Sequence, residues 1–260
     1  MVIVLSRPIF LSWLENIMEC ANLIIVDKHK LSRSVSEHIC CTMKSITKNT
    51  LQFKAYRVLS HELMMGRYKP GQALSLRPLA ARLGTSPMPI REAVSRLIAE
   101  RVLVLLPNRK VIVPWMTRAR FIELSRFRQL LEGTVAEIAC KQITPQLLRK
   151  LVRVNSVIKS CLSKNHIRRA LALNLDFHLS IYNASRADVM LPVIEMLWRQ
   201  AGPFIALTPS MPGVKWSARH HDKIIDALKA GSPHKARLAV QRDIEDTLQE
   251  LLKYATFEGE

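Results

Sequence analysis

Residues 75–99 limit the possible folds more than any other stretch, because two short apolar patterns of helical spacing lie on either side of a tight turn. The first pattern ends at Gly84, where a left-handed residue commonly closes a helix. Its apolar members are Leu76, Leu79, Ala80 and Leu83, and those of the second pattern are Ile90, Ala93, Val94, Leu97 and Ile98. Arg91 and Arg96 lie off the second apolar stripe. These features predict a helix-turn-helix whose second helix suits the major groove of DNA.

The sequence on both sides of this motif predicts a winged helix. Residues 51–68 have helical apolar spacing, and the proline and glycine within residues 69–71 stop that helix. After the motif, β-prone runs at residues 102–106 and 111–113 are separated by a Pro-Asn-Arg-Lys turn, which is typical of a hairpin with a basic tip. Three helices followed by a hairpin give a winged helix-turn-helix domain over residues 51–116.

The rest of the chain predicts a separate helical domain over residues 117–254, so the fold class is mainly α. Six helical patterns follow one another, and they predict an all-α bundle of six to seven helices. The patterns cover residues 118–142, 145–163, 167–184, 189–201, 216–230 and 234–254. Residues 202–213, with three prolines, are the one long loop that we expect.

Residues 1–50 are interpreted as an N-terminal extension. Charged residues and a proline interrupt its apolar part before the length of a membrane span, and no signal-peptide pattern is present. We expect the first 42 residues to be disordered, or to be upstream sequence included by a misplaced start, because Met43 lies close to the first regular pattern. The odd cysteine count without paired metal spacing predicts free thiols in a cytoplasmic protein. These cysteines are Cys20, Cys40, Cys41, Cys140 and Cys161.

The formal net charge of +18 is densest in residues 51–116, which contain 11 basic and 3 acidic side chains. A basic domain can bind nucleic acid, face an anionic membrane or simply be solvated, so charge alone does not choose between these. The helix-turn-helix pattern is what favours double-stranded DNA.

The two halves together resemble the GntR family of bacterial transcription regulators, in its FadR branch with an FCD effector domain. The resemblance is carried by GRYKPGQALS at residues 66–75, LAARLGTSPMPIREAVSRL at 79–97, FRQLLE at 127–132, DFHLSIYNAS at 176–185 and HHDKIIDALKAG at 220–231. It implies a homodimeric repressor that binds a DNA operator and is controlled by a small-molecule effector, often an organic acid.

The resemblance also places candidate DNA contacts. The family usually has an arginine or similar donor where this chain has Pro87, which offers no side-chain donor to a base. Base contacts are therefore expected from Arg91 and Ser86. Arg77 matches a contacting arginine of the family and is open to a base contact or, like Arg109 and Lys110 of the hairpin tip, a phosphate contact. The complete candidate set is Arg77, Ser86, Met88, Arg91, Arg96, Asn108, Arg109 and Lys110. The alternative for each of these arginines is a solvated surface charge.

Many FCD domains bind a metal through one aspartate and three histidines, and that pattern falls on Asn174, His178, His221 and Asp243. Two ligands have changed type, but one carboxylate and two imidazoles remain, and they suit Zn, Mn or Ni. The alternative is that the two histidines belong to the core. The resemblance also makes Arg128 a candidate for binding an acidic effector, with an ion pair to Glu132 as the alternative.

Two other functions compete with a ligand-controlled regulator. A metal-dependent enzyme could use His178, His221 and Asp243, but no nucleophile or general base accompanies them in the sequence, so we do not expect an enzyme. A basic protein that binds nucleic acid without sequence preference would show little discrimination between DNA sequences.

Overall fold

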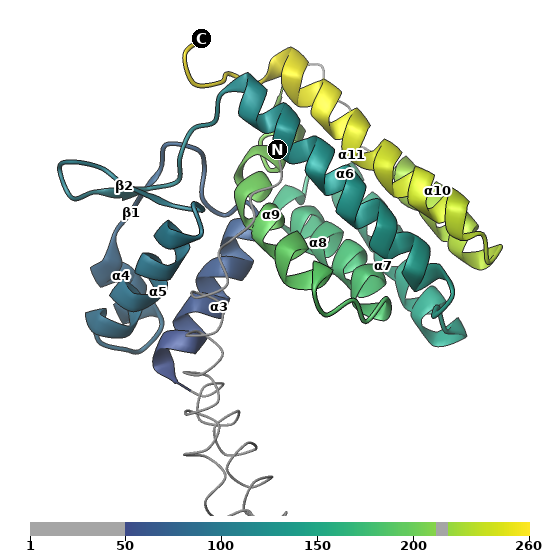
Figure 1. Ribbon diagram of the computed structural model, residues 1–260, viewed down its shortest axis with the longest axis horizontal. Coiled ribbons are helices and arrows are strands. Elements are labelled where there is room, and N and C mark those ends of the chain that lie inside the picture. Colours follow the sequence, from purple (N-terminus) through teal and green to yellow (C-terminus); the bar gives the residue numbers. More distant parts are fainter. Residues whose placement is uncertain (1–49, 212–217) are drawn as a thin grey trace, which may run out of the picture. The chain divides into compact units, whose positions relative to one another are not determined.

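The apolar stripe of residues 90–98 forms one side of a small helical core. The computed structural model describes residues 50–211 and 218–260. In it α4 (Leu76–Arg82) and α5 (Pro87–Ala99) make the expected helix-turn-helix, and α5 packs against both α4 and α3 (Leu51–Met64) (Figure 1). Gly84 closes α4 with φ +61°. The first helix ends four residues earlier than predicted, because Gly66 takes φ +64° and turns the chain.

A three-stranded antiparallel sheet completes this part of the fold. Its strands are β1 (Ala73–Leu74), β2 (Val104–Leu105) and β3 (Val111–Ile112), in the order β1-β3-β2. Ile112 pairs with Ala73 on one side and with Val104 on the other. The predicted hairpin is therefore present, whereas β1 was not predicted. Arg109 takes φ +61° at the hairpin turn.

The helical bundle comes after residue 117. Its elements are α6 (Arg118–Cys140), α7 (Pro145–Ser163), α8 (Ile167–Ala184), α9 (Met190–Ile205), the short 3-10 helix η1 (Thr208–Ser210), α10 (Arg219–Lys229) and α11 (Pro233–Tyr254). Thr144 begins α7 as predicted, since its hydroxyl accepts a hydrogen bond from the Leu147 N–H at 3.2 Å. The mainly α fold class is confirmed.

The predicted loop at residues 202–213 was wrong in its first part. The last turn of α9 continues through Gly202 and Pro203 to Ile205, although a proline removes one helical hydrogen bond. Pro203, Phe204 and Ile205 are all buried there. The lost hydrogen bond lies in the final turn of the helix, and the burial of these three apolar side chains offsets its cost.

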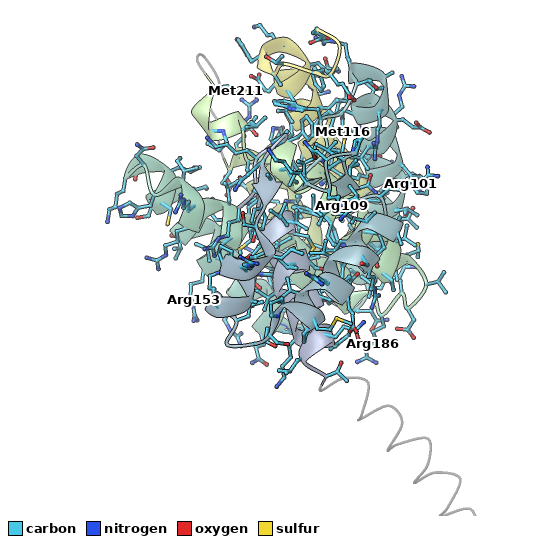
Figure 2. All side chains as sticks on the ribbon, turned by 90° about the vertical axis from the view of Figure 1, so that its left-hand side faces the viewer. Arg101, Arg109, Met116, Arg153, Arg186 and Met211 are labelled. Carbon is cyan, nitrogen blue, oxygen red and sulfur yellow. The ribbon has the colours of Figure 1, made fainter. Side chains whose placement is uncertain are left out.

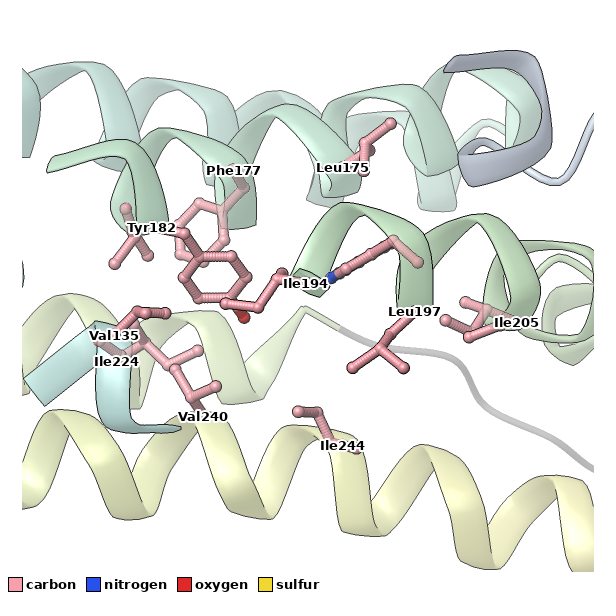
Figure 3. Packing of buried hydrophobic residues seen from close by; sticks show 14 of the residues in the cluster. Val135, Leu175, Phe177, Tyr182, Ile194, Leu197, Ile205, Ile224, Val240 and Ile244 are labelled. Carbon is pink, nitrogen blue, oxygen red and sulfur yellow. The ribbon is translucent and has the colours of Figure 1, made fainter. Parts of the chain in front are cut away.

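Two hydrophobic clusters hold the described chain together. One lies within residues 55–113, and the other gathers side chains mainly from α6 to α11. In the second, Phe177 and Tyr182 of α8 point toward the same interior as Val240 and Ile244 of α11 (Figure 3). Beyond the predicted end at residue 254, Phe257 is also buried in this cluster. The division at residues 116 and 117 stays a prediction, and the predictions for residues 1–49 lie outside the described residues.

Candidate DNA-binding surface and effector cavity

A buried carboxylate fixes α4 against α3. Both guanidinium amino groups of Arg82 bond to the two oxygens of Glu62, and the Tyr68 hydroxyl donates to the same carboxylate at 2.7 Å. Burial alone would raise the pKa of Glu62, but the hydrogen bonds from Arg82 and Tyr68, with the charges of Arg82 and Arg67, lower it below its usual range. This network sets the position from which α4 and α5 present their outer faces.

The candidate DNA contacts all have exposed side chains. Arg77 lies in the first turn of α4, and Ser86 is the N-cap of α5, where its hydroxyl makes no capping bond. Met88 is 60% exposed in the first turn of α5, which suits contact with a thymine methyl group. At the hairpin tip the Asn108 side-chain oxygen accepts a bond from the Lys110 N–H at 3.1 Å. Whether these residues contact DNA stays a prediction.

Arg96 differs from the other candidates because it is held inside the protein's own network. Its Nε donates to Glu100 at 3.0 Å, and its guanidinium lies 3.9 Å from the centre of the Tyr56 ring. The Tyr56 hydroxyl also donates to Glu100, at 2.8 Å. The same carboxylate accepts a bond of 3.0 Å from Arg199 of α9. Glu100, the C-cap of α5, therefore joins the end of that helix to the bundle.

A second contact of α9 with the DNA-binding helices is made against α3, and it requires glycine. A Cβ atom on Gly202 would lie 2.4 Å from the Leu63 carbonyl oxygen and 2.5 Å from that of Met64. Both are shorter than any ordinary contact, so only glycine fits.

A small cavity lies inside the bundle. Its volume is about 20 Å³, slightly more than the ~10–15 Å³ that one water molecule needs. Its wall consists of Arg128, Ile158, Asn174, His178, Trp198, Ile205, Ala218, His221, Asp243, Ile244 and Thr247. The structure thus brings together all the effector and metal candidates of the sequence. Trp198 of α9 also contributes to this wall.

Three of the predicted metal ligands form a compact cluster. Ligand atoms of His178, His221 and Asp243 all lie within 4.8 Å of one another. The His178 Nε2 is 3.3 Å from Asp243 Oδ2, close to the ~3.3 Å that separates two ligands bound at 2.0–2.1 Å around a tetrahedral zinc ion. Asn174, one helical turn before His178, is buried on the same cavity wall.

The neighbours of the two imidazoles orient their nitrogen atoms. Tyr182 donates its hydroxyl proton to Glu132 at 2.7 Å, so its oxygen can accept from His178 Nδ1, 3.2 Å away. Asn155 donates its amide to Asp222, which leaves its carbonyl oxygen to accept from His221 Nδ1 at 3.2 Å. In these tautomers both Nε2 atoms carry lone pairs, as metal ligands require. Because the His178 lone pair then faces the Asp243 carboxylate at 3.3 Å, a metal cation held by both atoms would be favourable.

Electrostatic interactions favour the protonation states of His221 and Asp243 that bind a metal. Burial, followed by the charge of His178, lowers the pKa of His221 to about 3, so its imidazole is neutral at physiological pH. Burial raises the pKa of Asp243, but its contact with the His178 ring, and then the positive charge of the neighbouring histidines when they are protonated, outweigh this and lower it to about 2. A neutral imidazole and an ionised carboxylate are the forms that bind divalent metals.

Arg128 is buried on the cavity wall, and its Nε donates to Glu132 at 2.7 Å. Its guanidinium lies 4.7 Å from the centre of the Trp198 ring. The ion pair with Glu132, which was the alternative predicted from the sequence, is therefore present. It does not remove Arg128 from the cavity, so the role of Arg128 in effector binding stays a prediction.

The arrangement of a winged helix followed by a helical bundle with this cavity agrees with two family models. The model for bacterial regulatory proteins of the gntR family matches residues 51–113, and the FCD domain model matches residues 123–246. The chain belongs to the GntR family, in the branch with an FCD domain.

Individual GntR-family relatives support this assignment. The HTH-type transcriptional regulator McbR of Escherichia coli strain K12 is 32% identical over 145 residues, which cover 56% of this chain and 66% of McbR. The solved structure of E. coli McbR/YncC has a TM-score of 0.72 at 26% identity and covers 78% of this chain and 98% of that one. The protein named "Probable D-xylose utilization operon transcriptional repressor" from Paenarthrobacter nicotinovorans is 26% identical over 204 residues, 78% of this chain and 89% of that protein.

Several residues of this GntR-family site were missed by sequence reasoning. Glu62, Glu100 and Asn155 hold the functional side chains through contacts that are distant in the sequence. Two of the missed residues had a local signal, since Tyr182 lies one helical turn after His178 and Glu100 one helical turn after Arg96. Within the two described ranges, no helix is both long enough and apolar enough to cross a membrane.

Proposed function

We propose that the chain is a sequence-specific DNA-binding regulator, and a repressor, whose operator affinity depends on a small molecule in the bundle cavity. The observation that carries the proposal is the presence in one chain of an exposed recognition helix and a buried cavity with ionisable walls, joined by α9. We place it in the cytoplasm, where DNA is accessible. Cys140 and Cys161 are free thiols, which agrees with a reducing compartment.

The DNA-reading role is tested by selecting bound fragments from genomic DNA and then measuring affinity for the selected operator. Arg91→Ala is expected to weaken specific binding by about 1–3 kcal/mol, the usual contribution of one good base contact. Arg57→Ala removes an exposed arginine of α3 in the same domain and serves as the matched control. An unchanged operator affinity for Arg91→Ala would contradict the role. Equal affinity for all sequences would instead favour the nonspecific nucleic-acid-binding alternative.

With a divalent metal bound, the charges around the cavity would favour an anionic effector. Arg128, Glu132 and Asp243 together carry one net negative charge, and a divalent metal would reverse it to one net positive charge. Because the bond to Glu132 uses Nε of Arg128, the two terminal nitrogens of the guanidinium can pair with both oxygens of a carboxylate. An organic acid therefore fits the chemistry of this site.

The size of the cavity indicates how such a ligand would act. A cavity of about 20 Å³ holds one ion or water, so an organic acid must displace part of the wall. Trp198 and Ile205 of α9 belong to that wall, while Arg199 bonds to Glu100 and Gly202 packs against α3. We propose that effector entry shifts α9 and thereby changes the pose of the DNA-binding helices.

We also propose that His178, His221 and Asp243, with Asn174 as a weak fourth ligand, hold a divalent Zn, Mn or Ni ion. When bound, the ion would supply a positive charge that attracts an acidic effector. Elemental analysis of the purified protein tests this, with His178→Ala plus His221→Ala as the variant. Equal metal content in both proteins would show that the histidines belong to the core. The metal-dependent enzyme remains the weaker alternative, because the GntR-family matches are to regulators.

Homodimer formation is proposed for the face between α6 and α11. Phe127 and Leu130 of α6 are 45% and 51% exposed, and Leu238 of α11 is 49% exposed. Burying these side chains against a second copy would be favourable. Analytical ultracentrifugation of Leu130→Glu should show a shift toward monomer. Val189→Glu changes an equally apolar, exposed position and should leave the mass unchanged. A dimeric Leu130→Glu protein would exclude this face.

A further inference from the structure

The hairpin of helices α7 and α8 carries a concentration of positive charge that the proposed function does not use. Residues 141–172 contain eight lysine and arginine side chains and no aspartate or glutamate. All eight are exposed. Arg149, Lys150 and Arg153 line an open groove of about 480 Å³ together with polar Thr144 and Gln146.

Most of these charges lack an acidic partner. Lys150 pairs with Asp176 at 3.0 Å, and Lys159 pairs with Asp222 at 2.6 Å. No ion pair with any residue in the described ranges is found for the other six, Lys141, Arg149, Arg153, Lys164, Arg168 and Arg169, which we name the α7–α8 basic surface. Arg149 and Arg153 stand one helical turn apart, where like charges repel and destabilise a helix. An anionic partner would relieve this repulsion.

We propose that the α7–α8 basic surface binds the phosphate backbone of double-stranded DNA. From Arg149 to Lys164 the chain follows about 22 Å of helix axis at ~1.5 Å per residue. A duplex of that length carries about 13 phosphate charges, at one per ~1.7 Å. The duplex therefore carries more phosphate charges than the six cations of the surface can pair with. Four of the six cations are arginines, whose guanidinium groups pair with two phosphate oxygens at once.

DNA fits this surface better than an anionic membrane does. Helices that lie on membranes bury an apolar face rich in large side chains beside their basic face. In α7 the apolar face, with Leu151 and Ile158, is already buried in the bundle. Residues 141–172 contain no phenylalanine, tyrosine or tryptophan. Arg153, labelled in Figure 2, lies at the edge of the side chains drawn there.

The test compares the salt dependence of binding to a random-sequence duplex, so that it does not depend on the operator or the effector. The full chain is compared with the variant in which Arg149, Arg153, Arg168 and Arg169 are changed to glutamine. A control changes the same number of exposed cations on α10 and α11, namely Lys223, Lys229, Lys235 and Arg242, to glutamine. Glutamine keeps a helix propensity close to that of arginine and lysine, and circular dichroism checks the fold of both variants.

Each lost phosphate contact is expected to reduce the slope of log affinity against log salt by about 0.9. A reduction of about 1.8 or more in the arginine variant, beyond that of the control, supports the proposal. Equal slopes in the two variants overturn it. A loss of binding to phosphatidylserine vesicles with an unchanged DNA slope would also overturn it, by assigning the surface to membranes.

Discussion

The contact between Gly202 and α3 yields the sharpest prediction for the joint between α9 and the DNA-binding helices. In Gly202→Ala the new Cβ would meet the carbonyl oxygens of Leu63 and Met64 at 2.4 and 2.5 Å. Ordinary contacts begin at 3.4 Å, so each is about 1 Å too short. Both atoms are backbone and no side-chain rotation can relieve the overlap, so α9 has to move away from α3.

The expected size of the effect comes from two opposing contributions. Inserting a methyl group into a well-packed interior costs about 1–3 kcal/mol, and two backbone clashes place this position at the upper end. Replacing glycine by alanine within a helix returns ~1 kcal/mol. The net loss of about 2 kcal/mol should lower Tm by roughly 4–8 °C in a chain of this size.

Gly133→Ala is the matched control in α6. Its Cβ would lie 2.9 Å from Gln241 Cγ and 3.2 Å from Arg237 Cγ, both in flexible side chains. There the alanine should lower Tm by less than Gly202→Ala does, because the close atoms belong to side chains that can shift and the helix gains ~1 kcal/mol. Thermal unfolding by differential scanning calorimetry makes the comparison. A Gly202→Ala protein as stable as Gly133→Ala would refute a tight joint between α9 and α3.

Two further predictions concern Glu62 and Arg199. Because the folded pKa of Glu62 is lowered, its charge stabilises the fold above the ordinary glutamate pKa, and this contribution is lost as pH falls through the folded value. In Glu62→Gln, stability measured by urea unfolding should therefore vary less with pH over that acidic window, and parallel curves would contradict the network. Arg199→Met keeps the buried apolar stem but removes the bond to Glu100. Coupling between two sites typically changes affinity about 5–150-fold, so the ratio of the operator affinities measured with and without Zn²⁺ should fall toward one in this variant. A ratio equal to that of the unmodified chain would exclude Arg199 as the link.

Local signals in the sequence predicted most helices well, and the failures have a common cause. The bounds of α7 agree with the prediction because Thr144 and a following proline mark its start unambiguously. In α9 the local signals were misleading, since Gly202 and Pro203 normally end helices. Their place in the helix depends on the α3 carbonyl groups and on a buried core, which are contacts that no local pattern contains.

The cavity shows the same division between local and long-range information. The i, i+4 spacing predicted that Asn174 and His178 share a face, and both lie on the cavity wall. The approach of Asp243 in α11 to within 3.3 Å of His178 in α8 depends on the packing of the whole bundle.

The approach of Asp243 to His178 connects the two positions, 174 and 243, at which this chain departs from the family pattern. The resemblance placed an aspartate at 174 and a histidine at 243, whereas this chain has an asparagine and an aspartate there. Because both positions line one cavity, exchanging them moves the carboxylate across the site without removing its charge. Asp243 faces Nε2 of His178, whereas Nδ1 of the same ring contacts the Tyr182 hydroxyl, which is itself held by Glu132 of the Arg128–Glu132 pair. A cation at the cluster and an acid at Arg128 would therefore act on one connected network, so that each should strengthen the binding of the other.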